Sequence, residues 1–167
     1  MDITYREVEL SDSLALIEFL SNAGNETDNL SFSAESLKLT PESEKRFINK
    51  FKSNKKNLML VAEISGEIIG NASIERNRTP RYSHRAELSI AVKKKFWGRG
   101  IGSRLMELLL DFARESGVEI LYLEVRSDNE RAINLYKKFG FSSIGIYKKF
   151  FKINKKYYDA CLMLCEI

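Results

Sequence analysis

Apolar and polar residues alternate along several short segments of the chain, which is the pattern of half-buried β-strands. The clearest case is residues 86–92, where Leu88, Ile90 and Val92 alternate with smaller or polar side chains. Two apolar runs joined by Ser65-Gly66 predict a β-hairpin. Together, the predicted strands are residues 3–8, 58–64, 68–74, 86–92, 118–125, 141–153 and 157–166.

Apolar residues that recur at helical spacing predict helices between these strands. The first predicted helix is capped by residues 11–13 and ends at Gly24, and the second begins at Thr40 with Pro41 in its first turn. The residues predicted to face the core are Leu14, Ile17 and Leu20 in the first helix and Phe47, Ile48 and Phe51 in the second.

The second half of the chain alternates strand and helix. One helix follows the glycine-rich residues 98–102 and ends near Gly117, and a shorter one, capped by Asp128 or Asn129, ends at Gly140. A strand, helix, strand order of this kind places two strands parallel to each other. Combined with the antiparallel hairpin before it, this order predicts an α/β (α+β) fold with a mixed, partly parallel central sheet flanked by helices.

The composition predicts a single domain over residues 1–167. Hydrophobic residues make up 44% of the chain, and no repeat or Pro/Gly-rich linker divides it. No apolar run approaches the roughly 20 residues that a membrane span needs, and the first residues lack the basic and apolar regions of a signal peptide. We therefore expect a cytoplasmic protein that does not bind membranes.

The two cysteines, Cys161 and Cys165, lie on one face of the last predicted strand, too far apart to bond to each other. The single histidine, His84, is distant from them in sequence. We therefore expect no metal site and predict that both thiols are small buried side chains.

Glycines at every second position, Gly98, Gly100 and Gly102, lie between a predicted strand and a predicted helix. Backbone N–H groups at a helix N-terminus have no partners within the helix, and the helix dipole is positive there, so such a turn suits an anion. Glycine lets a phosphate approach the backbone closely, and Arg99 and Arg104 add positive charge. The spacing fits neither a dinucleotide-binding fingerprint nor a P-loop. The alternative is a strand-to-helix turn that binds no ligand.

Three segments carry a family resemblance: residues 97–102 (Trp-Gly-Arg-Gly-Ile-Gly), residues 123–129 (Leu-Glu-Val-Arg-Ser-Asp-Asn) and residues 132–141, which contain Asn-Leu-Tyr and end in Gly-Phe. With them the sequence resembles the GNAT superfamily of N-acetyltransferases, most strongly over residues 87–141. Within it, the chain is similar to ribosomal-protein N-terminal alanine acetyltransferases and to bacterial amino-acid and small-amine acetyltransferases. Trp97 departs from the family pattern, because that position usually holds Gln or Arg.

The resemblance implies acetyl-CoA as the cofactor, bound in a splayed cleft between two central parallel strands. The pantetheine arm would bond to the backbone of residues 90–92, the pyrophosphate would lie on the glycine turn, and an Asn after the next strand would contact the arm. Part of the excess positive charge, at Lys93 to Lys95, Arg99 and Arg104, surrounds this turn. The implied cofactor-binding residues are Ile90, Ala91, Val92, Gly98, Arg99, Gly100, Ile101, Gly102, Ser103, Asn129 and Tyr136.

Acetyl transfer to an amine needs a base for the ammonium proton, a donor to the oxyanion and a proton for the leaving thiolate. Tyr136 resembles the family tyrosine that protonates the sulfur, and a backbone N–H of the strand that ends at Val92 is the expected oxyanion donor. Glu87 and Glu124 both resemble glutamate bases of the family, and the sequence ranks neither above the other. For each carboxylate the alternative is a structural ion pair with a neighbouring arginine.

The predicted function is an N-acetyltransferase that acts on a primary amine (a small molecule, an amino acid or a protein N-terminus) by direct attack in a ternary complex. The residues expected near the acceptor are Glu26, Asp28, Phe32 and the basic segment 147–158. The alternative is a catalytically silent module that binds acyl-CoA as a sensor. Nucleic-acid binding through the lysine-rich segments is disfavoured because they lack a recognition helix or an aromatic platform. A homodimer stays open.

Overall fold

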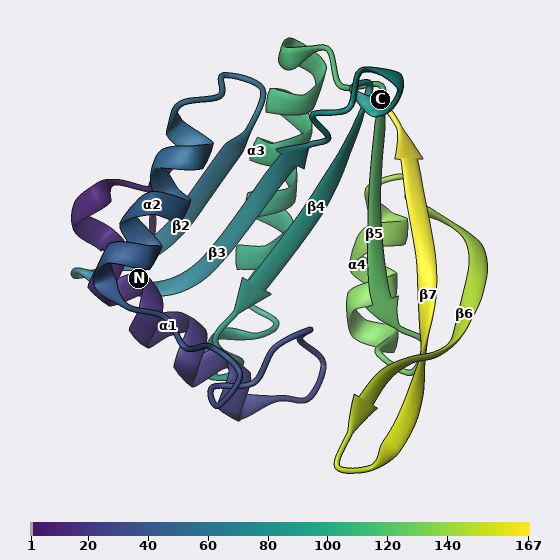
Figure 1. Cartoon of the computed structure of the whole chain (residues 1–167), viewed down its shortest axis with the longest axis horizontal. Helices are drawn as coiled ribbons and strands as arrows, with labels where there is room; N and C mark the ends of the chain where they lie inside the picture. Colours follow the sequence, from purple (N-terminus) through teal and green to yellow (C-terminus); the bar gives the residue numbers. More distant parts are fainter. Residues whose placement is uncertain (1) are drawn as a thin grey trace.

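The structure, a computed structural model, describes residues 2–167 and is built on one seven-stranded sheet. The strand order is β1-β2-β3-β4-β5-β7-β6, and every neighbouring pair is antiparallel except β4 and β5. Every predicted strand is present within two residues of its predicted ends, which confirms the mixed, partly parallel sheet (Figure 1). The strands are β1 (Thr4–Glu7), β2 (Leu58–Ile64), β3 (Glu67–Arg76), β4 (Arg85–Val92), β5 (Ile120–Arg126), β6 (Ser142–Ile153) and β7 (Lys156–Glu166).

In the described residues, four α-helices cover the two faces of the sheet: α1 (Ser13–Glu26), α2 (Pro41–Lys52), α3 (Ile101–Ser116) and α4 (Glu130–Lys138). Helices α1 and α2 lie on one face over β2 and β3, where Phe19, Ile48 and Val61 share a buried cluster (Figure 1). Helices α3 and α4 lie on the other face, in a larger cluster that includes Leu105 and Met163. Short 3-10 turns are formed by Leu10–Asp12, Pro80–Tyr82 and Lys94–Phe96.

The buried face of α1 differs from the predicted one. Leu14 is 65% exposed, whereas Leu16, Phe19 and Ala23 are buried. A strict step of three residues drifts around a helix that has about 3.6 residues per turn, so the predicted stripe does not stay on one face. The prediction for Leu14 was therefore wrong.

Gly24 does not end α1, which continues to Glu26. A Cβ at Gly24 would lie 2.9 Å from the backbone nitrogen of Ala34, so the close approach of the following loop requires glycine here. The glycine that looked like a helix stop is a packing residue, and the helix carries Glu26 to the edge of the site described below.

Helix α2 begins as predicted. Thr40 Oγ1 accepts a hydrogen bond from Ser43 N at 3.2 Å, which caps the first turn. Ile48 and Phe51 are buried as predicted, but Phe47 is 42% exposed. Phe47 was wrongly assigned to the core because it lies next to Ile48 in sequence and therefore about 100° around the helix from it.

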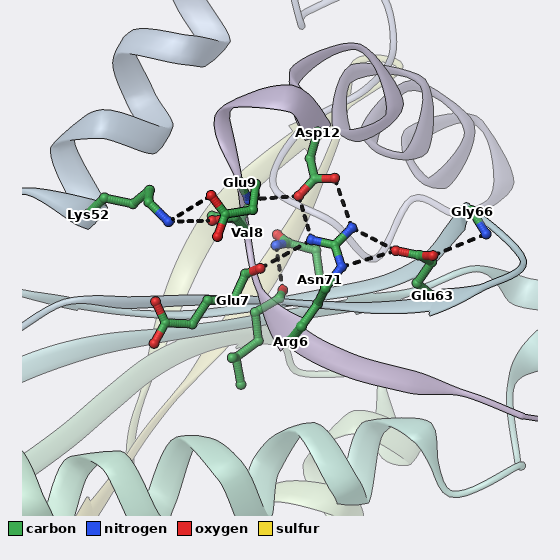
Figure 2. A network of polar contacts seen from close by, with 10 residues as sticks. Arg6, Glu7, Val8, Glu9, Asp12, Lys52, Glu63, Gly66 and Asn71 are labelled. Carbon is green, nitrogen blue, oxygen red and sulfur yellow. Dashed lines mark hydrogen bonds and ion pairs between the residues drawn. The ribbon is translucent and has the colours of Figure 1, made fainter.

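A network of ion pairs holds β1 and the start of α1 to the rest of the sheet (Figure 2). Arg6 of β1 donates two hydrogen bonds to the Asp12 carboxylate, at 2.7 and 2.9 Å, and two to Glu63 Oε2 of β2, at 3.1 and 2.6 Å. Asp12 also accepts from the backbone N–H of Glu9 at 2.7 Å. The hydrogen bonds from Arg6 are the main reason that the pKa of Asp12 is lowered.

Strands β4 and β5 pair at one end only. Their Cα partners run from Arg85 opposite Ile120 to Glu87 opposite Tyr122, and beyond these residues the strands separate (Figure 1). The last part of β4 therefore lacks a neighbour on this side. This confirms the predicted splay between two central parallel strands.

Cys161 and Cys165 are free, buried thiols on β7, as predicted. Over residues 2–167, no helix is both long enough and apolar enough to cross a membrane. The same residues hold no group of three or more His, Cys, Asp or Glu side chains that is placed to bind a metal ion.

Candidate active site

A cavity of about 750 Å³ lies where β4 and β5 separate. Its walls come from the last part of β4, the glycine turn, α4, the loop after α1 and the β6–β7 hairpin. Of the predicted catalytic and cofactor-binding residues, only Arg99 does not line it; Arg99 lies over the ring of Phe96, 5.6 Å from its centroid. The predicted residues that line the cavity are Glu87, Ile90, Ala91, Val92, Gly98, Gly100, Ile101, Gly102, Ser103, Glu124, Asn129 and Tyr136.

The pairing of β3 with β4 decides which backbone groups of β4 face the cavity. Lys93 N donates to Ile69 O at 2.9 Å. Because hydrogen-bonded pairs alternate along an antiparallel ladder, the backbone groups of Ala91 also bond to β3. Those of Ile90 and Val92 point to the opposite side, where β5 has moved away. Ile90 and Val92 thus have backbone groups that can hydrogen-bond to a ligand in the cleft.

Gly98 and Gly100 adopt left-handed backbone conformations, with φ of 74° and 80°, which an L side chain would strain. A Cβ at either position would meet no atom within 4 Å, so the space beside the turn is open. Helix α3 begins directly after Gly100. An open turn at a positive helix end fits a phosphate group. Gly102 serves packing, since a Cβ there would lie 3.2 Å from Leu135 Cδ2 of α4.

Several of the cations expected around this turn already have carboxylate partners. Glu67 Oε1 accepts from Lys93 Nζ at 2.7 Å and from Lys95 Nζ at 3.1 Å. Arg104 pairs with Glu107 at 3.0 Å. The turn therefore has less unpaired positive charge than its sequence suggests, because Glu67 reaches it from the distant β2–β3 hairpin.

Trp97 and Arg131 form a stacked pair that sequence reasoning did not find. Trp97 donates its indole N–H to Val92 O at 2.6 Å, and the Arg131 guanidinium lies 3.3 Å from the centroid of the Trp97 ring. Both side chains line the cavity. The only sequence signal for Arg131 is its position two residues after Asn129, in the first turn of a helix that carries predicted site residues.

Tyr136 lies in the cavity wall and is 7% exposed. Asn129 Oδ1 accepts from Ala132 N at 3.3 Å, which caps α4, and Tyr136 follows Ala132 by one turn on the cavity side. The ring of Tyr136 packs against Phe141 with centroids 5.8 Å apart. Burial raises the pKa of Tyr136, so its phenol is protonated at neutral pH and can donate a proton.

Glu87 and Glu124 lie on the same open face of the sheet. Tyr122 is the Cα partner of Glu87 on β5, and Glu124 follows two residues later, where the strands have begun to separate. On the other side, Glu75 of β3 is the Cα partner of Glu87. Burial raises the pKa of Glu87, and the charges of Glu124 and Glu75 raise it further. The sequence ranked neither glutamate above the other as a base, and the raised pKa of Glu87 makes it the stronger candidate.

The neighbouring arginines are engaged elsewhere. Arg126 Nε and Nη2 donate to the Asp128 carboxylate at 2.9 and 2.6 Å. Arg85 lies over the ring of Tyr122, 4.8 Å from its centroid. Within residues 2–167, neither candidate base forms an ion pair. The alternative in which these glutamates serve as structural partners of an arginine is therefore not realised.

The loop after α1 closes the cavity on the expected acceptor side, and Phe32 lines the cavity there. Glu26 instead accepts a hydrogen bond from Lys94 N at 2.7 Å, so its carboxylate holds the segment before the glycine turn. Asp28 contributes its backbone carbonyl, which accepts from Arg126 Nη1 at 3.2 Å. These bonds attach the loop both to the cofactor side of the cavity and to β5.

The β6–β7 hairpin closes the cavity from the opposite side. A shift in register disturbs β6 before Phe151, and Asp159 of β7 stabilises this irregular segment. The Asp159 carboxylate accepts from Lys148 Nζ at 2.8 Å and from Lys149 N at 2.9 Å. Phe150 and Phe151 line the cavity, as expected for this segment.

Comparisons with known proteins agree with this architecture. Residues 25–141 match the model of the Acetyltransferase (GNAT) family. N-alpha-acetyltransferase RimI of Mycobacterium tuberculosis is 39% identical over 94 residues, which are 56% of this chain and 57% of that protein. L-amino acid N-acetyltransferase AaaT of Escherichia coli is 37% identical over 105 residues, 62% of this chain and 65% of that protein. The chain thus covers less than two thirds of the length of these two relatives.

Solved structures share the whole fold. An acetyltransferase of the GNAT family from Streptococcus pneumoniae superimposes with a TM-score of 0.96 at 33% identity, over 99% of this chain and 100% of that one. Ribosomal-protein-alanine N-acetyltransferase from Brucella melitensis gives a TM-score of 0.88 at 25% identity, over 98% and 99% of the two chains. The family match includes the glycine turn and α4, and with it the chain belongs to the acetyltransferase (GNAT) family.

Proposed function

We propose that the protein is an N-acetyltransferase that transfers the acetyl group of acetyl-CoA to a primary amine by direct attack in a ternary complex. The observation that carries this proposal is one cavity that joins the open glycine turn to the buried phenol of Tyr136 and to Glu87, a carboxylate of raised pKa. Membership of the family supports acetyl-CoA as the acyl donor. We further propose that residues 1–167 work as one domain in the cytoplasm.

The cofactor, when bound, supplies a thioester whose carbonyl carbon is open to attack by an amine. In this proposal the backbone N–H groups of residues 98–103 bind its pyrophosphate. The N–H and C=O of Ile90 bond to the amides of the pantetheine arm, as an added strand would. Asn129 uses Oδ1 to cap α4 and keeps its Nδ2 group for the arm, so its two predicted roles are compatible.

Glu87 is the proposed base. A primary amine is an ammonium ion at neutral pH and must lose a proton before it attacks, and a base with a raised pKa accepts that proton more readily. Glu87 meets this requirement because burial and two neighbouring carboxylates raise its pKa. Glu124 is then the nearby charge that helps to keep the pKa of Glu87 high.

Val92 and Tyr136 serve the other two steps. The carbonyl of Val92 already accepts from Trp97, whereas its N–H points into the cleft, where it can donate to the developing oxyanion. As the nitrogen–carbon bond forms and the carbon–sulfur bond breaks, the phenol of Tyr136 gives its proton to the leaving thiolate, and the resulting phenolate takes the second proton that the acetylated nitrogen must lose. Burial keeps the phenol protonated until the thiolate departs. Burial also makes the phenol a weaker acid, and the transfer is possible because the same desolvation raises the proton affinity of the thiolate.

The acceptor is proposed to be a cationic primary amine. Glu87 and Glu124 both line the cavity, and this pair of carboxylates attracts an ammonium group to the place where the base lies. Relatives of the chain are named [Ribosomal protein bS18]-alanine N-acetyltransferase and Spermidine N(1)-acetyltransferase. A protein N-terminus, an amino acid and a polyamine are therefore the classes of amine to test.

Thiol release tests the proposal. The protein is incubated with acetyl-CoA and one member of each amine class, and free CoA thiol is measured against a reaction without amine. We expect release above this background with at least one class, and mass spectrometry should find one acetyl group added to the amine. Binding of acetyl-CoA without acetylation of any amine in the panel would instead support the acyl-CoA sensor.

A further inference from the structure

The pyrophosphate site proposed above needs positive charge, and three of the cations expected near it from the sequence pair with carboxylates. Lys93 and Lys95 both bond to Glu67, and Arg104 pairs with Glu107. These cations would have to leave carboxylate partners to reach a phosphate. A cation that lines the cavity without such a partner is the better candidate.

Arg131 is such a cation. Its side chain lines the same cavity as Gly98 and Gly100 and is exposed. In the part of the chain that the structure describes, it has no carboxylate partner, and its guanidinium lies over the ring of Trp97. Arg131 therefore keeps its N–H donors available for an anion.

Trp97 holds Arg131 in place. The indole N–H donates to Val92 O at 2.6 Å, which fixes the ring at the end of β4, directly before Gly98. The Arg131 guanidinium lies 3.3 Å from the ring centroid, a distance that corresponds to stacking. A stacked guanidinium has its face covered, but the N–H groups project from its edge, where they can bond to phosphate oxygens in a fork.

We propose that Arg131, positioned by Trp97, binds the pyrophosphate of acetyl-CoA in this protein. This inference rests on the proposed function. The family pattern has Gln or Arg at the position of Trp97. In this chain the side-chain contact to the pyrophosphate would instead come from Arg131 of α4. Trp97 is then a positioning residue, and Arg131 is the residue that touches the cofactor.

Binding measurements on three ligands test the assignment. CoA, dephospho-CoA and pantetheine are titrated by calorimetry into the wild type, Arg131→Gln and Arg131→Lys. Dephospho-CoA keeps the pyrophosphate but lacks the 3′-phosphate, and pantetheine lacks every phosphate. Loss of a hydrogen bond between two charged groups predicts that Arg131→Gln binds CoA and dephospho-CoA about 10- to 100-fold more weakly, while its affinity for pantetheine is unchanged. Arg131→Lys should fall between, because lysine keeps the charge but not the planar fork.

Lys137→Gln is the matched control. Lys137 lies on the same helix and carries the same charge, but it does not line the cavity. Its affinity for CoA should equal that of the wild type, which separates a local contact from an effect of net charge. Trp97 is the only tryptophan in the chain, so a change of its emission when CoA is added reports on the stack directly.

Three results would overturn the assignment: unchanged CoA affinity in Arg131→Gln, an equal loss with pantetheine, or a loss with CoA that is absent with dephospho-CoA. The last result would move Arg131 to the 3′-phosphate. If the wild type binds none of the three ligands, the proposed function itself fails. The two failures are therefore distinguishable.

Discussion

Replacement of Glu87 by glutamine should lower the catalytic rate and at the same time raise the stability of the fold. If Glu87 takes the ammonium proton, Glu87→Gln should lower kcat/KM by about 10²- to 10⁴-fold, the usual contribution of a general base. The fold should become more stable, because Glu75, the Cα partner of Glu87 on the neighbouring strand, still raises the pKa of Glu87 although it pairs with Lys50. Like charges at such positions cost roughly 0.2–1 kcal/mol, which corresponds to a gain in Tm of about 0.5–4 °C.

The pH profile gives the sharper readout. Since the pKa of Glu87 is raised above its usual value, the wild type should lose kcat/KM as the pH falls through this raised pKa. Glu124→Gln removes one of the charges that raise the pKa of Glu87. The acidic limb should therefore persist in Glu124→Gln but move to lower pH, whereas Glu87→Gln should lose the limb.

The assay measures thiol release at saturating acetyl-CoA. The concentration of the amine is varied at each of several pH values from acid to neutral. Thermal melts of each variant check the fold. The reasoning fails if Glu87→Gln keeps the acidic limb. If Glu124→Gln then loses it, Glu124 is the base. If neither variant loses it, no carboxylate of this pair acts as the base.

Three further predictions concern other parts of the site and fold. Tyr136→Phe should lower kcat by about 10²- to 10⁴-fold with little change in CoA affinity by calorimetry; an unchanged kcat would remove its role as the acid. Gly100→Ala should destabilise the fold by about 1–2 kcal/mol in urea unfolding because of its positive φ, whereas Gly145→Ala, also in open space but without positive φ, should not; equal effects would exclude strain as the cause. Asp12→Asn should lower the free energy of unfolding by about 1.5–3 kcal/mol at neutral pH, because it weakens the charged hydrogen bonds from Arg6. Because the folded-state pKa of Asp12 is lowered, this stabilisation is present above the unfolded pKa of about 3.9 and is lost as the pH falls through the folded pKa. The urea midpoints of the wild type and Asp12→Asn should therefore converge in acid. A difference that stays constant with pH would contradict the ion pair.

Local patterns in the sequence were enough to predict the strands, the order of the elements and the glycine turn. Strand alternation and a glycine-rich turn between a strand and a helix depend on near neighbours in the chain, so they can be predicted before the fold is known. The same kind of reasoning failed for Leu14 and Phe47, because which face of a helix is buried depends on the sheet it packs against. Gly24 was misread for a related reason: the loop that requires a glycine there comes from residues ten positions later.

The sequence by itself thus determined the family resemblance, the mixed sheet and many, but not all, of the residues that line the cavity. The tertiary structure alone decided how charge is distributed among them. Glu75 and Glu124 act on Glu87 across strands, and Glu67 takes up the lysines before the glycine turn. Arg131 meets Trp97 because the first turn of α4 and the segment that follows β4 come together at the cavity. Electrostatic interactions depend on distance in space, and residues far apart in the chain acquire that distance only when the sheet and its helices have packed.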